Sequence, residues 1–369
     1  MPNQTYSKGT RASTIVILIS RLVKIAQWKL TNMASDSAAN SPAPADVGPP
    51  SPEELVSRAR ALIPNLRGRT ARCESERRIP QKNLDEMFKA GLFNALKPKR
   101  FGGYEMGWDT LCDITLAIAE GCGSTGWIIG VCGGNPLMVT NFTADVQEEV
   151  WGMNPNAIIS SAKMTSCSFR KVDGGYIGSG IMAISSGSQH ADWFFAGGSA
   201  IDGSDKPLST LIPLGDVTIL DTWQVMGLAG TGSHDLEMTD VFVPDAHAFI
   251  GGSKPPGAGF YDGIYKVGHR ALGPYTLAAV VVGMAADALD IFVQGIKSRT
   301  SRHGANIADF QSLQLRIAES AAELDAAKLM IRSNSRIAMS FIGKGENVPR
   351  DIQAGLILDA SYASVLPAK

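Results

Sequence analysis

The chain has 369 residues, of which 34 are basic and 35 acidic, and its formal net charge is −1. Hydrophobic residues make up 44% and charged residues 19%, which is the balance of a globular protein rather than a disordered one. A chain of this length is sufficient for roughly two or three domains. The near-zero net charge excludes the broad basic surface typical of nucleic-acid-binding proteins, so no nucleic-acid partner is expected.

Cysteine and histidine residues are scattered along the chain without a recognisable motif. The five cysteines form no Cys-x-x-Cys pair, and their odd number argues against a full disulfide framework. The five histidines lie too far apart for an HExxH or HxH zinc signature. We therefore expect reduced thiols, a cytoplasmic protein and no metal site.

The N-terminal stretch differs from the rest of the chain. Residues 1–32 carry five basic side chains and no acidic one, and their apolar run at 14–19 is too short to span a bilayer. Such a composition is typical of an organellar transit peptide, and equally of an extension ahead of a true start at Met33. Residues 34–52 are small and Pro-rich, so 1–50 as a whole is predicted to be a basic extension and a flexible leader.

The first predicted domain covers residues 51–155 and is helical. Ser51 followed by Pro52 is a typical helix N-terminus. Further helices are expected over 81–90, which ends before a glycine, and over 108–121, where the apolar residues recur at helical spacing. The apolar, Gly-rich segment 126–139 is expected to be one buried helix.

The second predicted domain covers residues 156–250 and is built of β-strands. Short β-rich runs are separated by turn signals such as Asp173-Gly174-Gly175, and the run 236–243 alternates in polarity. This pattern predicts a small antiparallel barrel or sandwich.

The last predicted domain, residues 251–369, is a helical bundle. A Gly/Pro-rich crossing over 251–274 precedes helices expected over 277–293 and 308–341. The first of these helices is almost wholly apolar, which indicates burial inside a bundle or across a subunit interface, with no membrane partner. The chain therefore runs from helices through a β domain to long helices.

Few motifs point to chemistry. Residues 178–183 match the GxGxxA dinucleotide fingerprint, but β-type residues follow where that site needs a helix. Three polar stretches in the β domain remain, at 159–161, 184–193 and 223–233. Their hydroxyls and glycines would let a planar heterocycle approach the backbone, with Trp193 or a second tryptophan over its face. The alternative interpretation is ordinary turns of a Gly-rich barrel.

These stretches resemble the acyl-CoA-dehydrogenase-like flavin monooxygenases, the two-component group that hydroxylates phenols. The most specific matches are Ser-Ser-Gly-x-x-His-Ala-Asp-Trp at 185–193 and Trp223…Gly-Leu-Ala-Gly-Thr-Gly-Ser at 227–233 with Val-Phe-Val-Pro at 241–244. The resemblance extends from Ser51 to the C-terminus. It implies an α+β fold of acyl-CoA dehydrogenase type, with an N-terminal α-helical domain, a middle antiparallel β-barrel domain and a C-terminal helical bundle.

The resemblance also implies an activity. The chain would be the oxygenase component, receiving reduced FMN (FAD being possible) from a separate flavin reductase component. With O2 the flavin would form a 4a-hydroperoxide that hydroxylates a small aromatic substrate. A homo-oligomer, dimer or tetramer, is implied as well.

Site residues follow from the same motifs. Ser186 resembles the hydroxyl that bonds the flavin near N5, and Ser161 resembles the serine beside the substrate. The remaining assignments are a catalytic candidate, His190; the cofactor-binding residues Ser185, Trp193, Thr231, Ser233, Arg299 and Arg302; and the substrate-binding residues Asn135 and Ser160.

The chain departs from the family pattern in several places. Ala229 stands where an arginine is usual, Ile184 where a tryptophan is common, and Asn135 where relatives can have a histidine. The family's final helix, with its phenol-directed histidine, is expected to be missing beyond Lys369, and residues 359–364 look like its beginning. The bundle is therefore predicted to be incomplete.

Two other functions remain open. An acyl-CoA dehydrogenase would need FAD and a catalytic carboxylate, and its Thr-Glu-Pro signature is absent near Ser160. A truncated, non-catalytic homologue would act only in assembly with full-length relatives.

Overall fold

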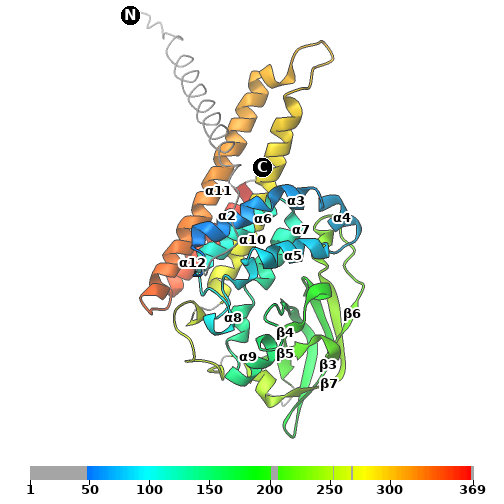
Figure 1. The fold of residues 1–369 in the computed structure, drawn as a ribbon, viewed down its shortest axis with the longest axis vertical. Helices are drawn as coiled ribbons and strands as arrows, with labels where there is room; N and C mark the ends of the chain where they lie inside the picture. The colour runs from blue at the N-terminus through cyan, green and yellow to red at the C-terminus, as the bar shows by residue number, and fades with distance from the viewer. Residues whose placement is uncertain (1–47, 201–206, 252, 267–268, 367–369) are drawn as a thin grey trace, which may run out of the picture. The chain divides into compact units, whose positions relative to one another are not determined.

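The structure is a computed structural model that describes residues 48–200, 207–251, 253–266 and 269–366. The predictions made for residues 1–47 lie outside the described residues. The chain divides into the units Met1–Gly48 and Pro49–Lys369, and the second is described here. Within it, most helices lie on one side and the strands on the other (Figure 1).

The N-terminal part of this unit is helical, as the sequence predicts. The N-cap at Ser51 is confirmed, since its Oγ accepts a hydrogen bond from the Glu54 backbone N at 3.2 Å. The helices are α2 (Pro52–Ala61), α3 (Ile63–Arg67), α4 (Thr70–Ser75), α5 (Gln81–Lys89), α6 (Trp108–Ala119), α7 (Gly123–Cys132), α8 (Pro136–Val139) and α9 (Ala144–Trp151).

The single helix expected over 126–139 is wrong. Helix α7 ends at Cys132, a short turn follows, and α8 begins at Pro136. Two consecutive glycines, Gly133 and Gly134, weaken the helix, and a proline is best tolerated in a first turn because it has no N–H to donate. The break places Asn135 between the two helices, where it becomes part of the candidate site.

The β domain forms one sheet with the strand order β6-β7-β3-β2-β4-β5-β8, and β1 also pairs with β4. Most neighbours are antiparallel, as expected, but β1 and β2 both run parallel to β4. Only Ala162 separates β1 from β2, so the two strands follow one another along β4, the first beside its beginning and the second beside its end, and share its direction. The strands are β1 (Ile159–Ser161), β2 (Lys163–Val172), β3 (Gly175–Ser185), β4 (Trp193–Ala200), β5 (Pro207–Pro213), β6 (Thr218–Leu220), β7 (His234–Pro244) and β8 (Ala248–Ile250).

The first C-terminal helix is longer than the predicted 277–293, whereas the second lies close to the predicted 308–341. The C-terminal helices are α10 (His269–Ile296), α11 (Gln311–Gly343) and α12 (Arg350–Val365). Helix α12 thus begins well before residues 359–364, the segment that looked like the start of a last helix, and it packs on α10 and α11. Its buried residues Leu356, Ala360 and Ala363 belong to the core of these helices.

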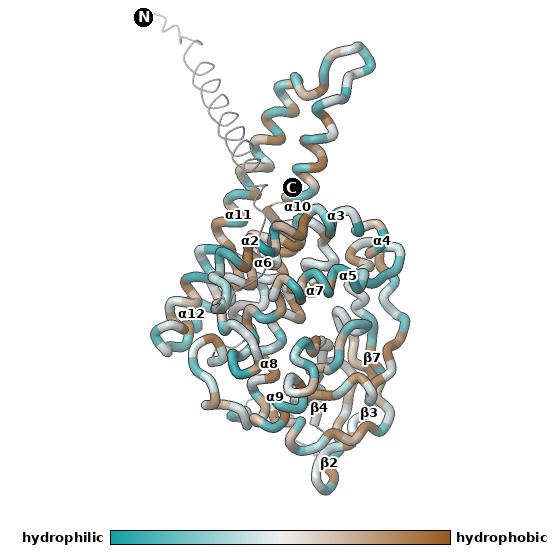
Figure 2. Tube along the Cα trace, viewed as in Figure 1, coloured by the Kyte–Doolittle hydropathy of each residue, from teal (hydrophilic) through white to brown (hydrophobic). Residues whose placement is uncertain are grey.

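Helix α10 is both long and strongly apolar. Its stretch Gly273–Ile296 has a mean hydropathy of 1.9, so by length and composition alone it could cross a membrane. It packs against α6, α7, α11 and α12, and about a third of this stretch is buried. Hydrophobic residues follow this helix in Figure 2, whereas polar and apolar residues alternate along α11.

Helix α6 lies at the centre of the helical layer and touches both α7 and α10 closely. A Cβ added at Gly283 of α10 would lie 2.5 Å from the carbonyl oxygen of Leu116 and 2.7 Å from the Cβ of Ala119. A Cβ added at Gly126 of α7 would lie 2.6 Å from the same Ala119 Cβ. Helices α10 and α7 therefore each need a glycine at the point where they approach α6.

The helices and the sheet share a core. One cluster of buried side chains joins Leu55 and Ile128 of the helices to Phe169 and Leu236 of the sheet. Because this core is continuous, α7 is held against the loops that follow β3 and precede β7. The candidate site lies at that junction.

Candidate functional site

The three polar stretches singled out in the sequence meet where α7 packs on the sheet. The turn after β3 is made by Gly187, whose φ of +75° lies in the left-handed region that glycine favours. The backbone N of Gly187 donates to the carbonyl of Thr231 at 2.8 Å. This bond ties the turn after β3 to the short 3-10 helix η5 (Ala229–Thr231).

Four side chains from these segments form a continuous hydrogen-bonded chain, here called the hydroxyl chain. Trp127 Nε1 of α7 donates to Ser186 Oγ at 3.0 Å, and Ser186 Oγ lies 2.8 Å from Ser233 Oγ. Ser233 Oγ lies 2.8 Å from Thr231 Oγ1, which donates to the carbonyl of Leu228 at 2.9 Å. The sequence therefore identified three of its four members.

Ser160 and Ser185 form a second, shorter hydrogen-bonded pair. Their Oγ atoms lie 2.7 Å apart, and Ser160 Oγ also donates to the carbonyl of Ser186 at 2.7 Å. Both side chains are fully buried. Ser161 points to the opposite face of β1, since side chains alternate along a strand. It is half-buried, and no side-chain hydrogen bond joins it to another described residue.

Asn135 is buried beside the same strand. Its Nδ2 donates to the carbonyl of Ile159 at 2.7 Å, while its Oδ1 is buried without a hydrogen-bond partner among the described residues. A buried amide oxygen rarely stays unpaired in a folded protein unless a water or ligand satisfies it. Asn135 Oδ1 is therefore an acceptor that a water or a bound molecule has to satisfy.

Ile184 has an unusual backbone. Its φ is +58°, a conformation that is strained for a β-branched residue, and its backbone N donates to Asp235 Oδ1 at 3.0 Å. The side chain is 47% exposed, two residues before Ser186. Strain of this kind concentrates at functional sites. It leaves an apolar surface next to the hydroxyl chain.

His190 does not join the hydroxyl chain. Its ring packs on the guanidinium of Arg78, with 3.3 Å between Arg78 Nε and His190 Nε2. Burial, and then the positive charge of Arg78, lower the pKa of His190 to about 4. A neutral ring held this way orders the turn after β3, and among the described residues no hydrogen bond joins it to the serines assigned to the site.

Acidification should destabilise the protein through His190. Its pKa is about 4 in the folded protein against 6.5 as the ordinary value, so the unfolded chain binds more protons between these pH values. Stability is therefore lost as pH falls from 6.5 through 4, by at most about 3 kcal/mol. Urea unfolding at pH 7 and at pH 4.5 measures the free energy of unfolding. It should fall less between these pH values in His190→Gln than in the unmodified protein. The exposed His303→Gln is the matched control, and an equal pH dependence in both variants would contradict the assignment.

The structure separates three other predicted residues from the hydroxyl chain. Trp193 packs beside His247, with ring centroids 5.8 Å apart, and lines a separate cavity of about 270 Å³ at one end of the sheet. Trp193 therefore does not cover a ring placed at Ser186. Arg299 and Arg302 lie exposed in the connection between α10 and α11, at the end that points away from the sheet (Figure 1).

Two residues of the site were missed by sequence reasoning. Trp127 could have been found, because a tryptophan inside an aliphatic helix needs a partner for its N–H. Glu74 of α4 gives no such signal. Its Oε1 accepts from Ser124 Oγ at 2.8 Å and its Oε2 from the backbone N of Ala229 at 3.1 Å, so it holds η5 against the helices.

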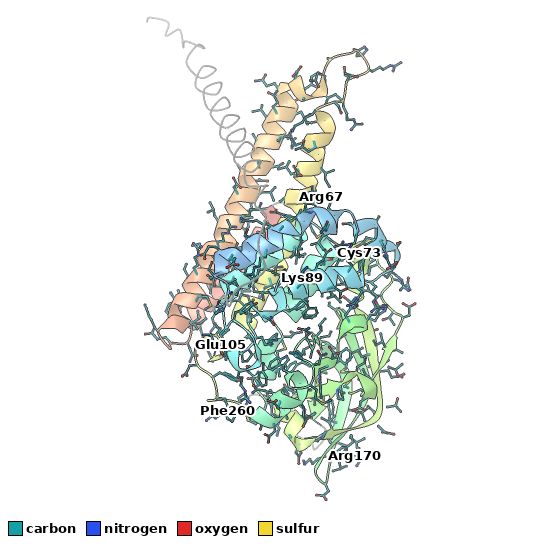
Figure 3. The ribbon with its side chains drawn as sticks, viewed as in Figure 1. Arg67, Cys73, Lys89, Glu105, Arg170 and Phe260 are labelled. Carbon is teal, nitrogen blue, oxygen red and sulfur yellow. The ribbon has the colours of Figure 1, made fainter. Side chains whose placement is uncertain are left out.

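The contact between η5 and α4 is close. A Cβ added at Gly230 would lie 2.2 Å from Cys73 Sγ. Figure 3 labels Cys73 on the helical side of the molecule, and Arg170 near the opposite end of the sheet. The glycine therefore allows the loop that carries Thr231 and Ser233 to rest directly on α4.

Comparison with known proteins places this site in a family. Residues 52–152 match the N-terminal domain of acyl-CoA dehydrogenases, and residues 275–368 match their C-terminal domain. The chain is 35% identical over 307 residues to the flavin-dependent monooxygenase oxygenase subunit HsaA of Rhodococcus jostii, covering 81% of this chain and 80% of that protein. The chain belongs to the acyl-CoA-dehydrogenase-like flavin-dependent monooxygenases.

Further relatives agree with this family. The FADH2-dependent resorcinol hydroxylase oxygenase component of a Rhizobium species is 31% identical, over 80% of this chain and 76% of its own length. The crystal structure of 3-HSA hydroxylase from a Rhodococcus species is 32% identical, with a TM-score of 0.78 over 85% of this chain and 83% of that chain. The predicted fold and family are therefore confirmed, and the chain is an enzyme of flavin-dependent monooxygenase type.

The residues at the junction fit a flavin ring. They offer neutral hydroxyls, a strained apolar side chain with half its surface exposed, and a buried amide oxygen without a partner. Such a mixture of apolar surface and a few fixed polar groups suits a planar heterocycle with polar edges. Within the described ranges, no three His, Cys, Asp or Glu side chains lie together as metal ligands would.

Proposed function

We propose that this chain is the oxygenase component of a two-component flavin monooxygenase that hydroxylates a small aromatic substrate. The observation that carries the proposal is the hydroxyl chain through Ser186, which lies in the motif shared with this family. Relatives named as oxygenase subunits and components support a separate reductase as partner.

The cofactor would be a reduced flavin, FMN or FAD. Ser186 would meet the polar edge of its ring and Ile184 would cover an apolar face. When bound, the flavin supplies the electrons that let O2 oxygenate an aromatic carbon, and the protein supplies orientation and a dry cavity. Arg299 and Arg302 are proposed to reach the flavin phosphate of a neighbouring subunit, which fits their exposed position at a helix connection.

The residues on the substrate side have distinct chemistry. The Ser161 hydroxyl is free to donate to a phenolic oxygen, because no described residue accepts its proton. Asn135 Oδ1 can accept a hydrogen bond from the substrate or from a water. Ser160 and Ser185 instead brace the strand and the turn, since each hydroxyl is already bonded within the protein.

We further propose that the chain acts in the cytoplasm as a homo-oligomer. All five cysteines are free and buried thiols, the state expected in a reducing compartment. Large apolar side chains are exposed on the long C-terminal helices, including Ile291 and Phe292 of α10 and Leu329 of α11. Apolar surface of this kind favours contact with another copy of the chain.

Ser186→Ala tests the proposed flavin site. The variant should bind reduced flavin about tenfold more weakly, because one hydrogen bond to the ring edge is lost. Anaerobic titration with reduced FMN and with reduced FAD measures the dissociation constants, and product analysis with a flavin reductase and phenolic substrates measures hydroxylation. Ser168→Ala, at an exposed position on β2, is the control. If the unmodified chain binds neither reduced flavin, the proposed function is wrong.

A further inference from the structure

The hydroxyl chain has a defined direction, because both of its ends are fixed by chemistry. At one end, Trp127 Nε1 can only donate a hydrogen bond, so Ser186 Oγ must accept there. At the other end, the carbonyl of Leu228 can only accept, so the single proton of Thr231 Oγ1 is directed to it. The Ser186–Ser233 and Ser233–Thr231 contacts lie between these ends, so their hydrogen-bond directions must agree with both fixed ends.

The remaining protons follow one after another. Since the Thr231 proton goes to Leu228, Ser233 must donate across the 2.8 Å contact with Thr231. The Ser233 proton is then used, so Ser186 must donate across the 2.8 Å contact with Ser233. The proton of Ser186 is thereby directed into the protein, away from any bound molecule.

The backbone of Leu228 supports this arrangement. Its φ of +57° lies in the left-handed region, and its carbonyl also accepts from the Thr231 backbone N at 3.1 Å and from Trp223 Nε1 at 3.2 Å. Three donors thus converge on one strained carbonyl. Ser186 is 5% exposed against 2% each for Ser233 and Thr231, so Ser186 is the hydroxyl that opens toward the surface.

We propose that Thr231 and Ser233 are positioning residues that make Ser186 a hydrogen-bond acceptor only. The flavin atom that meets Ser186 must then carry a hydrogen. This inference rests on the proposed function, with the ring atom at Ser186 taken as the nitrogen N5, as the family resemblance implies. Reduced flavin has an N5–H that donates to Ser186, whereas N5 of oxidised flavin has a lone pair and no hydrogen, so two acceptors would face each other. The hydroxyl chain thus selects the reduced cofactor.

Thr231→Val is the direct test. Valine keeps the size and branching of threonine but removes the acceptor for the Ser233 proton. Ser233 can then donate to Ser186, whose own proton becomes free to meet N5 of oxidised flavin. We expect the unmodified chain to bind reduced flavin at least about tenfold more tightly than oxidised flavin. This ratio of the two dissociation constants, oxidised over reduced, should fall toward one in the variant. A tenfold change corresponds to about 30 mV in the two-electron potential of the bound flavin.

Two control variants separate the effect of the Ser186 proton's direction from a general weakening of the site. Thr231→Ser restores the hydroxyl and should recover the ratio. Trp127→Phe removes one hydrogen bond to Ser186 but leaves the proton of Ser186 directed to Ser233, so binding of both flavins should weaken with the ratio retained. Ser233→Ala is the second test variant if Thr231→Val does not fold, and its ratio should also fall toward one.

Anaerobic titrations with oxidised and reduced FMN, together with potentiometry of the bound flavin, provide these values without turnover. A ratio unchanged in both Thr231→Val and Ser233→Ala overturns the inference while flavin binding by the unmodified chain still supports the proposed function. A loss of the ratio in Trp127→Phe as large as in Thr231→Val also overturns it, because the effect would then follow from any disturbance of the site.

Discussion

Replacing Gly283 by valine should destabilise the protein by about 3 kcal/mol or more. A single Cβ at this position already comes within 2.5 Å of the Leu116 carbonyl oxygen and 2.7 Å of the Ala119 Cβ. The first obstacle is helix backbone, which cannot move aside as a flexible side chain can. Valine adds two methyl groups to that clash, so α10 must shift away from α6. Urea unfolding monitored by circular dichroism measures the loss.

Gly295→Ala is the matched control in the same helix. A Cβ at Gly295 would meet no atom within 4 Å. Alanine also has the higher helix propensity, so this variant should gain up to about 1 kcal/mol. Equal effects at both positions would mean that the approach of α10 to α6 does not depend on glycine.

Glu74→Ala is expected to have the second large effect, about 2–3 kcal/mol of lost stability. The half-buried carboxylate accepts from Ser124 Oγ and from the backbone N of Ala229, and it is the link between α4, α7 and η5. Its loss leaves both donors without this acceptor. Because η5 carries Thr231, the affinity for reduced flavin should fall as well, which anaerobic titration measures.

The control for this variant is Glu76→Ala, two residues away. Glu76 forms a surface pair with Arg72 at 2.7 Å, and both side chains are largely exposed. Exposed pairs of this kind contribute little, so the change should stay within about 0.5 kcal/mol and leave flavin affinity unaltered. A Glu74→Ala variant that matches this control would show that the position of η5 does not depend on this carboxylate.

The fold was predictable where local chemistry decides it. Ser51 begins α2 as an N-cap should, and Gly91, with φ of +77°, follows the end of α5. Where tertiary packing decides the structure, the hydrophobic pattern of the sequence was insufficient to predict it. The break before Pro136 and the parallel pairing of β1 and β2 with β4 depend on neighbours that are remote in sequence.

The site was predictable in part for the same reason. Hydroxyl residues in Gly-rich turns marked Ser186, Thr231 and Ser233, and the structure joins them in one hydrogen-bonded chain. The partners that orient them come from elsewhere in the sequence. Trp127 lies on a helix whose pattern shows only burial, and Glu74 lies on a short helix with no motif. Trp193 belongs to the shared motif, yet strand alternation turns it to another face.

The hydroxyl chain has a consequence for the order in which the protein folds. Trp127 and Ser186 are 59 residues apart in sequence, and Ser186 and Ser233 are 47 apart. Closing loops of this length costs entropy that is recovered only after the sheet has formed and α7 has docked on it. Helices such as α2 and α11 need only local bonds and can form earlier. Competence to bind a cofactor is therefore acquired late during folding, well after most of the helical structure has formed.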